Sequence, residues 1–77
     1  MSTKSDKDAY RVTGVSNIAY DLNSLLHNKL EEIVAFEKYK ADCENDQEVA
    51  SLFAEMEQRD KDDVQRIKPL LANYLGS

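Results

Sequence analysis

The sequence lacks the residues that brace or bend most small proteins. Cys43 is its one cysteine, so no disulfide can form within the chain, and a lone thiol is typical of a protein kept in a reducing cytoplasm. Gly14 and Gly76 are the two glycines, and their positions near opposite ends exclude a glycine-rich phosphate loop. The sequence also has no recognisable nucleophilic triad or nucleotide fingerprint. We therefore expect a binding protein rather than an enzyme.

Long apolar runs and a surplus of positive charge are missing as well. The apolar stretches are only a few residues long, far below the roughly 20 that span a bilayer. The polar segment 1–8 has no apolar run behind it, unlike a signal peptide. The 15 acidic residues outnumber the 10 basic ones, and a chain with a formal net charge of −5 repels phosphate backbones. We therefore expect a cytoplasmic protein that binds neither membranes nor nucleic acids.

The length of 77 residues leaves room for one domain. A single core below roughly 70–80 residues usually needs support from disulfides, a metal ion or a further subunit. Because one cysteine excludes the internal disulfide, the remaining supports are a metal ion, a partner, or both.

A helical pattern begins after a polar segment. Residues 1–14 lack periodicity, so we interpret them as a flexible N-terminal arm before a helical domain at residues 15–77. Ser16 suits the N-cap of a first helix that runs to about Cys43. Apolar residues then recur at steps of three and four, the period of a helix, at Leu22, Leu25, Leu26, Leu30, Ile33, Phe36 and Tyr39.

A second helix follows the polar segment 44–46. Asn45 or Asp46 can cap its start, and Gly76 stands near its end. Pro69 lacks the amide that a helix needs at that position, which predicts a bend or early fraying there. The apolar residues of this second helix are Val49, Leu52, Phe53, Met56, Val64, Ile67, Leu70, Leu71 and Tyr74.

The two helices are of similar length and predict an all-α fold, a two-helix antiparallel hairpin. Two helices alone cannot enclose a core, because each apolar stripe keeps one side in water. A second copy closes the core as a four-helix bundle, so we expect a homodimer. Acid-first pairs four residues apart indicate the solvated side of the second helix, at Glu55–Arg59, Glu57–Lys61 and Asp62–Arg66.

Carboxylates interrupt the apolar stripe. Asp60 stands in the middle of the second helix's stripe, and Asp63 shares the edge of that face. A buried carboxylate is costly unless it is paired or binds a metal. One interpretation is a cation site formed by Glu32, Asp60 and Asp63. The other places both aspartates at the solvated boundary, paired with Lys or Arg, and pairs Glu32 with Lys29.

The run from Glu32 to Tyr39, a short acidic loop, and the run from Asp60 to Asp63 resemble the helix hairpin of ferritin-like proteins. They are most similar to the half-bundle members, such as encapsulated ferritins and rubrerythrin-type chains. That family has a Glu with a Tyr seven residues later, as at Glu32 and Tyr39. Its second helix has a Glu followed three residues later by a His, a spacing that Asp60 and Asp63 match with different residue types.

The resemblance implies a dimer that holds a divalent cation, Fe or Mn, between subunits. The missing imidazole favours harder cations, since oxygen ligands suit Mg, Ca and Mn. The lone histidine, His27, stands four residues before Glu31 and is expected to form a surface hydrogen bond with it.

Two hypotheses for the function follow. The first is a homodimeric helical-bundle protein that acts as a protein-binding adaptor or regulator. The second is a ferritin-like metal-binding protein with Glu32, Asp60 and Asp63 as ligands.

Overall fold

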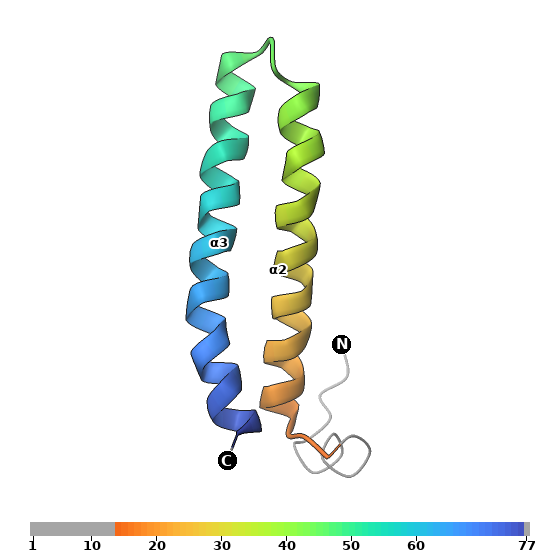
Figure 1. The fold of residues 1–77 in the computed structure, drawn as a ribbon, viewed down its shortest axis with the longest axis vertical. Helices are drawn as coiled ribbons and strands as arrows, with labels where there is room; N and C mark the ends of the chain where they lie inside the picture. Colours follow the sequence, from red (N-terminus) through yellow and green to blue (C-terminus); the bar gives the residue numbers. More distant parts are fainter. Residues whose placement is uncertain (1–13, 77) are drawn as a thin grey trace.

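The chain folds as two long helices side by side. A computed structural model describes residues 14–76, in which α2 (Asn17–Asp42) and α3 (Gln47–Leu75) run antiparallel and are joined by a tight turn (Figure 1). The described residues contain no strand. The predicted two-helix antiparallel hairpin is therefore confirmed. Of the arm predicted at residues 1–14, only Gly14 lies within the described residues.

The helix ends are fixed by local side chains. The Ser16 hydroxyl accepts a hydrogen bond of 3.2 Å from the Ala19 amide, which confirms Ser16 as the N-cap of α2. Asp46 rather than Asn45 caps α3, because its Oδ1 atom accepts a 3.1 Å hydrogen bond from the Val49 amide. These caps satisfy amides that have no partner within their own helix.

The prediction of fraying at Pro69 is wrong. Helix α3 continues through Pro69 to Leu75 and is capped by Gly76. Ile67 and Leu71, on either side of the proline, are both buried. Packing against α2 therefore holds this turn in the helix despite the amide that proline lacks. No helix in the part of the chain that the structure describes is long and apolar enough to cross a membrane.

The helices meet along a seam whose positions alternate in steps of three and four. This is the spacing of the inner positions of a coiled coil, in which side chains of one helix fit between those of the other. The seam residues of α2 and its C-cap, all buried or half-buried, are Ala19, Leu22, Leu26, Lys29, Ile33, Phe36, Lys40 and the cap Cys43. Those of α3 are Ala50, Phe53, Glu57, Asp60, Val64, Ile67 and Leu71.

One side of the seam carries a row of apolar side chains that nothing among the described residues covers. The row repeats every seven residues, so it keeps to one side of both helices. The Tyr39 ring contacts Phe36 of its own helix and Phe53 of α3, at 5.5 and 5.6 Å between centroids, which places the row beside the seam. We call this row the open face: Ile18, Leu25, Glu32 and Tyr39 of α2, with Val49, Met56, Asp63 and Leu70 of α3.

The open face is apolar apart from two acids at its centre. Ile18, Leu25, Tyr39, Met56 and Leu70 are each 39–52% exposed. Apolar side chains are unusual at these positions, because the residues that flank the seam of a coiled coil are often Glu or Lys. The hairpin alone therefore leaves a second apolar surface in water, as the sequence predicted.

Candidate functional site

A lysine on the open-face side of the seam joins the two helices. Lys29 Nζ lies 3.1 Å from Asp60 Oδ1 and 3.1 Å from Asp63 Oδ2. The Lys29 side chain is only 26% exposed and that of Asp60 only 6%. A carboxylate this deeply buried needs a charged partner, and Lys29 supplies it. We call Lys29, Glu32, Asp60 and Asp63 the central cluster.

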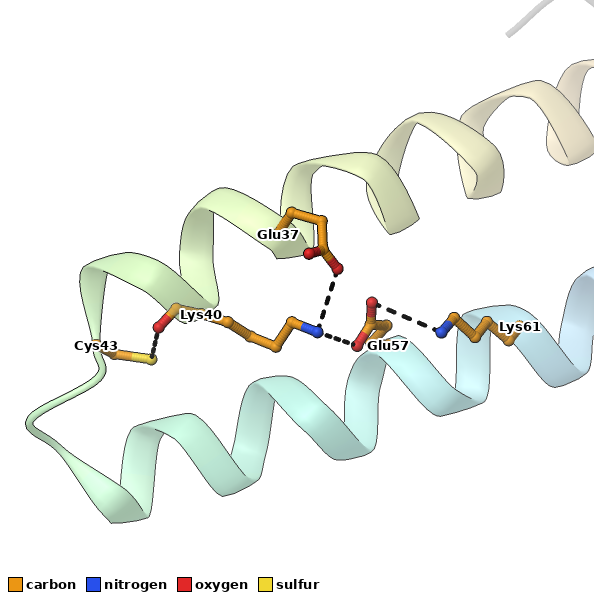
Figure 2. Close-up of polar contacts among 5 residues, drawn as sticks. All are labelled: Glu37, Lys40, Cys43, Glu57 and Lys61. Atoms are coloured by element: carbon orange, nitrogen blue, oxygen red, sulfur yellow. Dashed lines mark hydrogen bonds and ion pairs between the residues drawn. The ribbon is translucent and has the colours of Figure 1, made fainter.

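A second ion-pair network joins the two helices near the turn (Figure 2), and the positions of Glu37 and Lys61 place it on the side of the seam opposite the open face. Lys40 Nζ lies 3.0 Å from Glu57 Oε1 and 3.2 Å from Glu37 Oε2. Lys61 Nζ lies 3.8 Å from the other Glu57 oxygen. The chain therefore places both seam lysines on α2 and both seam acids on α3, which favours pairing of the two helices in this register.

Glu57 corrects one prediction from the sequence. The spacing of Glu57 and Lys61 indicated the solvated side of α3, but Glu57 is buried, with 7% of its surface exposed. The reason is its position four residues after Phe53 and three before Asp60, which belongs to the seam. Met56, which was assigned to the stripe instead, lies on the open face.

Glu32 is an acid of the central cluster whose affinity for a proton is increased. The Asp60 Oδ2 atom is buried and has no hydrogen-bond partner among the described residues. A proton on Glu32 provides a donor, because the Glu32 carboxyl can then hydrogen-bond to the Asp60 carboxylate. That hydrogen bond, together with the negative charge of Asp60, raises the pKa of Glu32 above its usual value.

The pKa values of the two seam acids, Asp60 and Glu57, are lowered, in contrast to that of Glu32. Burial alone would raise the pKa of Asp60, but hydrogen bonds with Glu32 and Lys29 outweigh it and hold the pKa below its usual value. The hydrogen bond from Lys40 lowers the pKa of Glu57 against a smaller opposing effect of burial. The folded state therefore favours the ionised form of both seam acids and the protonated form of Glu32.

These shifts predict opposing effects of acid on stability. The lowered pKa values of Glu57 and Asp60 stabilise the fold above their ordinary values of 4.5 and 3.8, and this contribution is lost as the pH falls further. The raised pKa of Glu32 acts oppositely, since its proton adds stability that is complete below 4.5. We expect the Tm, measured by circular dichroism, to rise on acidification towards pH 4.5 and to drop below it.

The matched control for this prediction is Glu32→Gln. This substitution removes the proton-binding group and keeps the shape of the side chain. The rise in Tm towards pH 4.5 should therefore disappear, while the drop in Tm below pH 4.5 should remain. Identical pH profiles for the two proteins would contradict the assignment of the rise to Glu32.

The structure brings the three predicted ligands to one side of the seam, with Lys29 bound to two of them. No group of three or more His, Cys, Asp and Glu side chains within residues 14–76 is placed to hold a metal ion. The cation site of Glu32, Asp60 and Asp63 thus stays a prediction. The contacts of Lys29 match the other interpretation, in which lysine pairs with the aspartates, although Asp60 is buried rather than at the solvated boundary.

The remaining candidates lie away from the central cluster. His27 Nε2 is 3.4 Å from Glu31 Oε1, and both side chains are well exposed, as expected of a surface pair. With Leu30 and Val34 they line a hollow of about 340 Å³ on the outer surface of α2. Cys43 is half-buried at the turn, where its Sγ atom lies 3.6 Å from the Lys40 carbonyl oxygen (Figure 2).

Comparisons with known protein families, with curated proteins and with solved structures gave no match. The resemblance to ferritin-like proteins is therefore neither supported nor contradicted by a relative, and it stays a prediction.

Proposed function

We propose that the chain is a homodimeric helical-bundle module that acts by binding a partner protein, and that two copies meet through their open faces. The observation that carries this proposal is the heptad row of exposed apolar side chains beside the seam, with Leu25 45% and Leu70 52% exposed. A single hairpin cannot cover that row with its own helices.

The size of the open face supports self-association. Helix α2 has 26 residues, about 40 Å at 1.5 Å per residue, and two adjacent helices are roughly 20 Å wide. Such a face offers about 800 Å² per copy, which is the area that stable protein interfaces bury on each partner. Joining two faces also yields the closed core of a four-helix bundle.

The outer surface of the proposed dimer supports the role of an adaptor. Tyr20 and Val34 of α2 are 51% and 72% exposed, and they lie on the side of α2 away from the open face. The hollow beside His27 belongs to the same surface. A dimer presents this surface twice, which increases the apparent affinity for a partner that has two matching sites.

Matched pairs of charged substitutions test the interface. We expect Leu25→Lys/Leu70→Lys to convert the dimer to monomer and to lower the Tm, because both lysines would be buried between copies. The control is Leu30→Lys/Leu75→Lys, which changes side chains of similar exposure, 46% and 54%, on the opposite side of the seam. The measurement is sedimentation equilibrium over a range of concentrations.

The control pair should remain dimeric. A wild-type protein that sediments as a monomer at about 100 µM would overturn the proposal, because interfaces of this size bind with a Kd in the micromolar range or below. Equal effects of the two pairs would show that the open face is not the contact surface.

A ferritin-like cation site is the alternative proposal. The unpartnered Asp60 Oδ2 atom favours it. The Lys29 ammonium competes with it, since it already lies 3.1 Å from both aspartates. Removal of that ammonium separates the two proposals.

A further inference from the structure

We infer that the two copies pack with their interhelical turns at the same end, so that α2 of each copy lies against α3 of the other and Arg59 of each copy faces the central cluster of its partner. This inference rests on the proposed self-association through the open face and specifies its geometry.

Two arrangements with two-fold symmetry are possible for hairpins that meet face to face. If the axis runs along the helices, the turns lie at the same end and α2 packs against the partner's α3. If the axis crosses the helices, the turns lie at opposite ends and each helix packs against its own copy. The side chains that border the open face distinguish these arrangements.

The two borders of the open face differ in charge. Each border residue follows an open-face residue by three positions, one step further from the seam. Along α2 the border is acidic or neutral, with Asp21, Asn28, Ala35 and Asp42. Along α3 it is basic at the centre, with Leu52, Arg59, Arg66 and Asn73. A surface with one acidic and one basic border is complementary to itself only when unlike borders meet.

Packing with the turns at the same end joins unlike borders. Lys29 lies level with Asp60, as their 3.1 Å contact shows, so each step along α2 is matched by a step back along α3. Asp21 is then level with position 68 of the partner, two residues or about 3 Å along the helix from Arg66, which brings opposite charges within reach of each other. By the same matching, the half-buried Ala35 is level with position 54 of the partner, two residues from Leu52, which is 51% exposed in the single hairpin.

Packing with the turns at opposite ends joins like borders. Full overlap of the open faces then places the row of Leu25 and Asp63 on the partner's row of Glu32 and Met56. In that register Arg59 meets its own copy at the symmetry axis, and Leu52 meets the partner's Arg66. Like charges and an apolar side chain against a guanidinium both disfavour this arrangement.

The central cluster also needs positive charge from the partner. Its one ammonium and three carboxylates leave a net charge of −2 in each copy when Glu32 is ionised. Covering that charge with a second negative cluster is unfavourable unless a cation compensates it. With the turns at the same end, the partner's Arg59 lies near the level of Glu32 and supplies one positive charge to each cluster.

The single cysteine allows a direct test in the full chain. Cys43 lies at the turn, so a spin label on it reports the distance between the two turns by pulsed dipolar spectroscopy. Turns at the same end should give a distance of about 15–30 Å, from a helix spacing of 8–10 Å and two label arms. Turns at opposite ends should give about 40 Å or more, the length of the helices.

A second variant guards against disturbance of the half-buried thiol. Cys43→Ser/Glu44→Cys moves the label to an exposed position in the same turn. A long distance in both labelled proteins overturns the inference and leaves the dimer standing. A protein without a dipolar signal that also sediments as a monomer overturns the proposed self-association itself.

Charge exchange tests the contact between borders. Asp21→Arg and Arg66→Asp should each raise the dimer Kd by up to about tenfold, because each change occurs twice in the dimer and turns attraction into repulsion. The combined protein should return to within about threefold of wild type, since the pair is restored with its charges exchanged. A combined protein as weak as the single variants would overturn the inferred arrangement.

Discussion

Replacing Lys29 by methionine is expected to lower the free energy of unfolding by about 3 kcal/mol, the lower end of the cost of breaking a buried ion pair. Methionine retains much of the lysine stem but removes the ammonium that lies 3.1 Å from Asp60 and Asp63. Asp60, with 4% of its surface exposed, is then a buried carboxylate without a cation. The lower end of the range applies because Lys29 is 26% exposed and water can partly replace it. Urea unfolding measures the loss.

Two further variants identify the cause of that loss. Lys29→Met/Asp60→Leu removes both charges from the seam and should recover most of the stability, because an apolar pair packs there without desolvated charge. Lys38→Met is the matched control, since Lys38 pairs with Asp42 at 2.6 Å but is 75% exposed. An exposed pair of this kind contributes less than about 1 kcal/mol. Equal losses for Lys29→Met and Lys38→Met would mean that burial of Asp60 is not the cause.

The Lys29→Met variant also distinguishes the two proposals for the function. If Glu32, Asp60 and Asp63 are cation ligands, Mn²⁺ should restore the Tm of Lys29→Met by taking the place of the ammonium. It should also shift the wild-type melt upward by several degrees, as a ligand that binds only the folded state does. Melts of both proteins that Mn²⁺ leaves unchanged would rule out the cation site and keep the central cluster as a structural element.

The helices themselves could be predicted because their signals are local. The apolar period, the Ser16 cap and the acidic turn before α3 each act within a few residues. The prediction at Pro69 failed because propensity is local while the packing of Ile67 and Leu71 against α2 is not. In α3 the buried residues on both sides of Pro69 keep the helix continuous.

The seam was harder to predict than the helices. Leu25 and Leu26 are adjacent, so steps of three and four fit two stripes on α2, and only packing decides that Leu26 lies inside and Leu25 outside. The burial of Glu57 was not predicted, because the stripe was assigned from apolar residues alone and charged residues were left out of it. The strict alternation of steps through Phe53, Glu57 and Asp60 is the signal that would have found it.

The central cluster could be predicted only in part. The position of Asp60 within the apolar stripe left open whether its side chain is buried or lies at the solvated boundary, and the structure shows that it is buried. Lys29 was expected to pair with Glu32 within α2, whereas the structure directs it to Asp60 and Asp63 of α3. Which carboxylate a lysine reaches depends on the register between helices, and no spacing within one helix contains that information.

Removing the Phe36 ring is expected to have the largest effect of any single substitution on the seam. Phe36 is 2% exposed, and its ring packs edge-on against Tyr39 at 5.5 Å and in a tilted orientation against Phe53 at 6.1 Å between centroids. Phe36→Ala should cost about 3–5 kcal/mol, because it leaves a cavity between α2 and α3 that no other element among the described residues of the same copy fills. That loss is comparable to the lower end of the total stability of small proteins, about 5 kcal/mol. Circular dichroism should therefore show a largely unfolded chain near room temperature at micromolar concentration.

Val34→Ala is the matched control, since Val34 lies on the same helix and is 72% exposed, and its Tm should change little. The loss in Phe36→Ala should be partly recovered at high protein concentration, because Tyr39 connects the Phe36 ring to the open face and dimerisation adds stability by mass action. A Phe36→Ala protein that melts at the wild-type temperature at every concentration would mean that the aromatic seam does not hold the hairpin together. A Tm that is lowered but independent of concentration would instead place the stability of the fold within a single copy, against the proposed dimer.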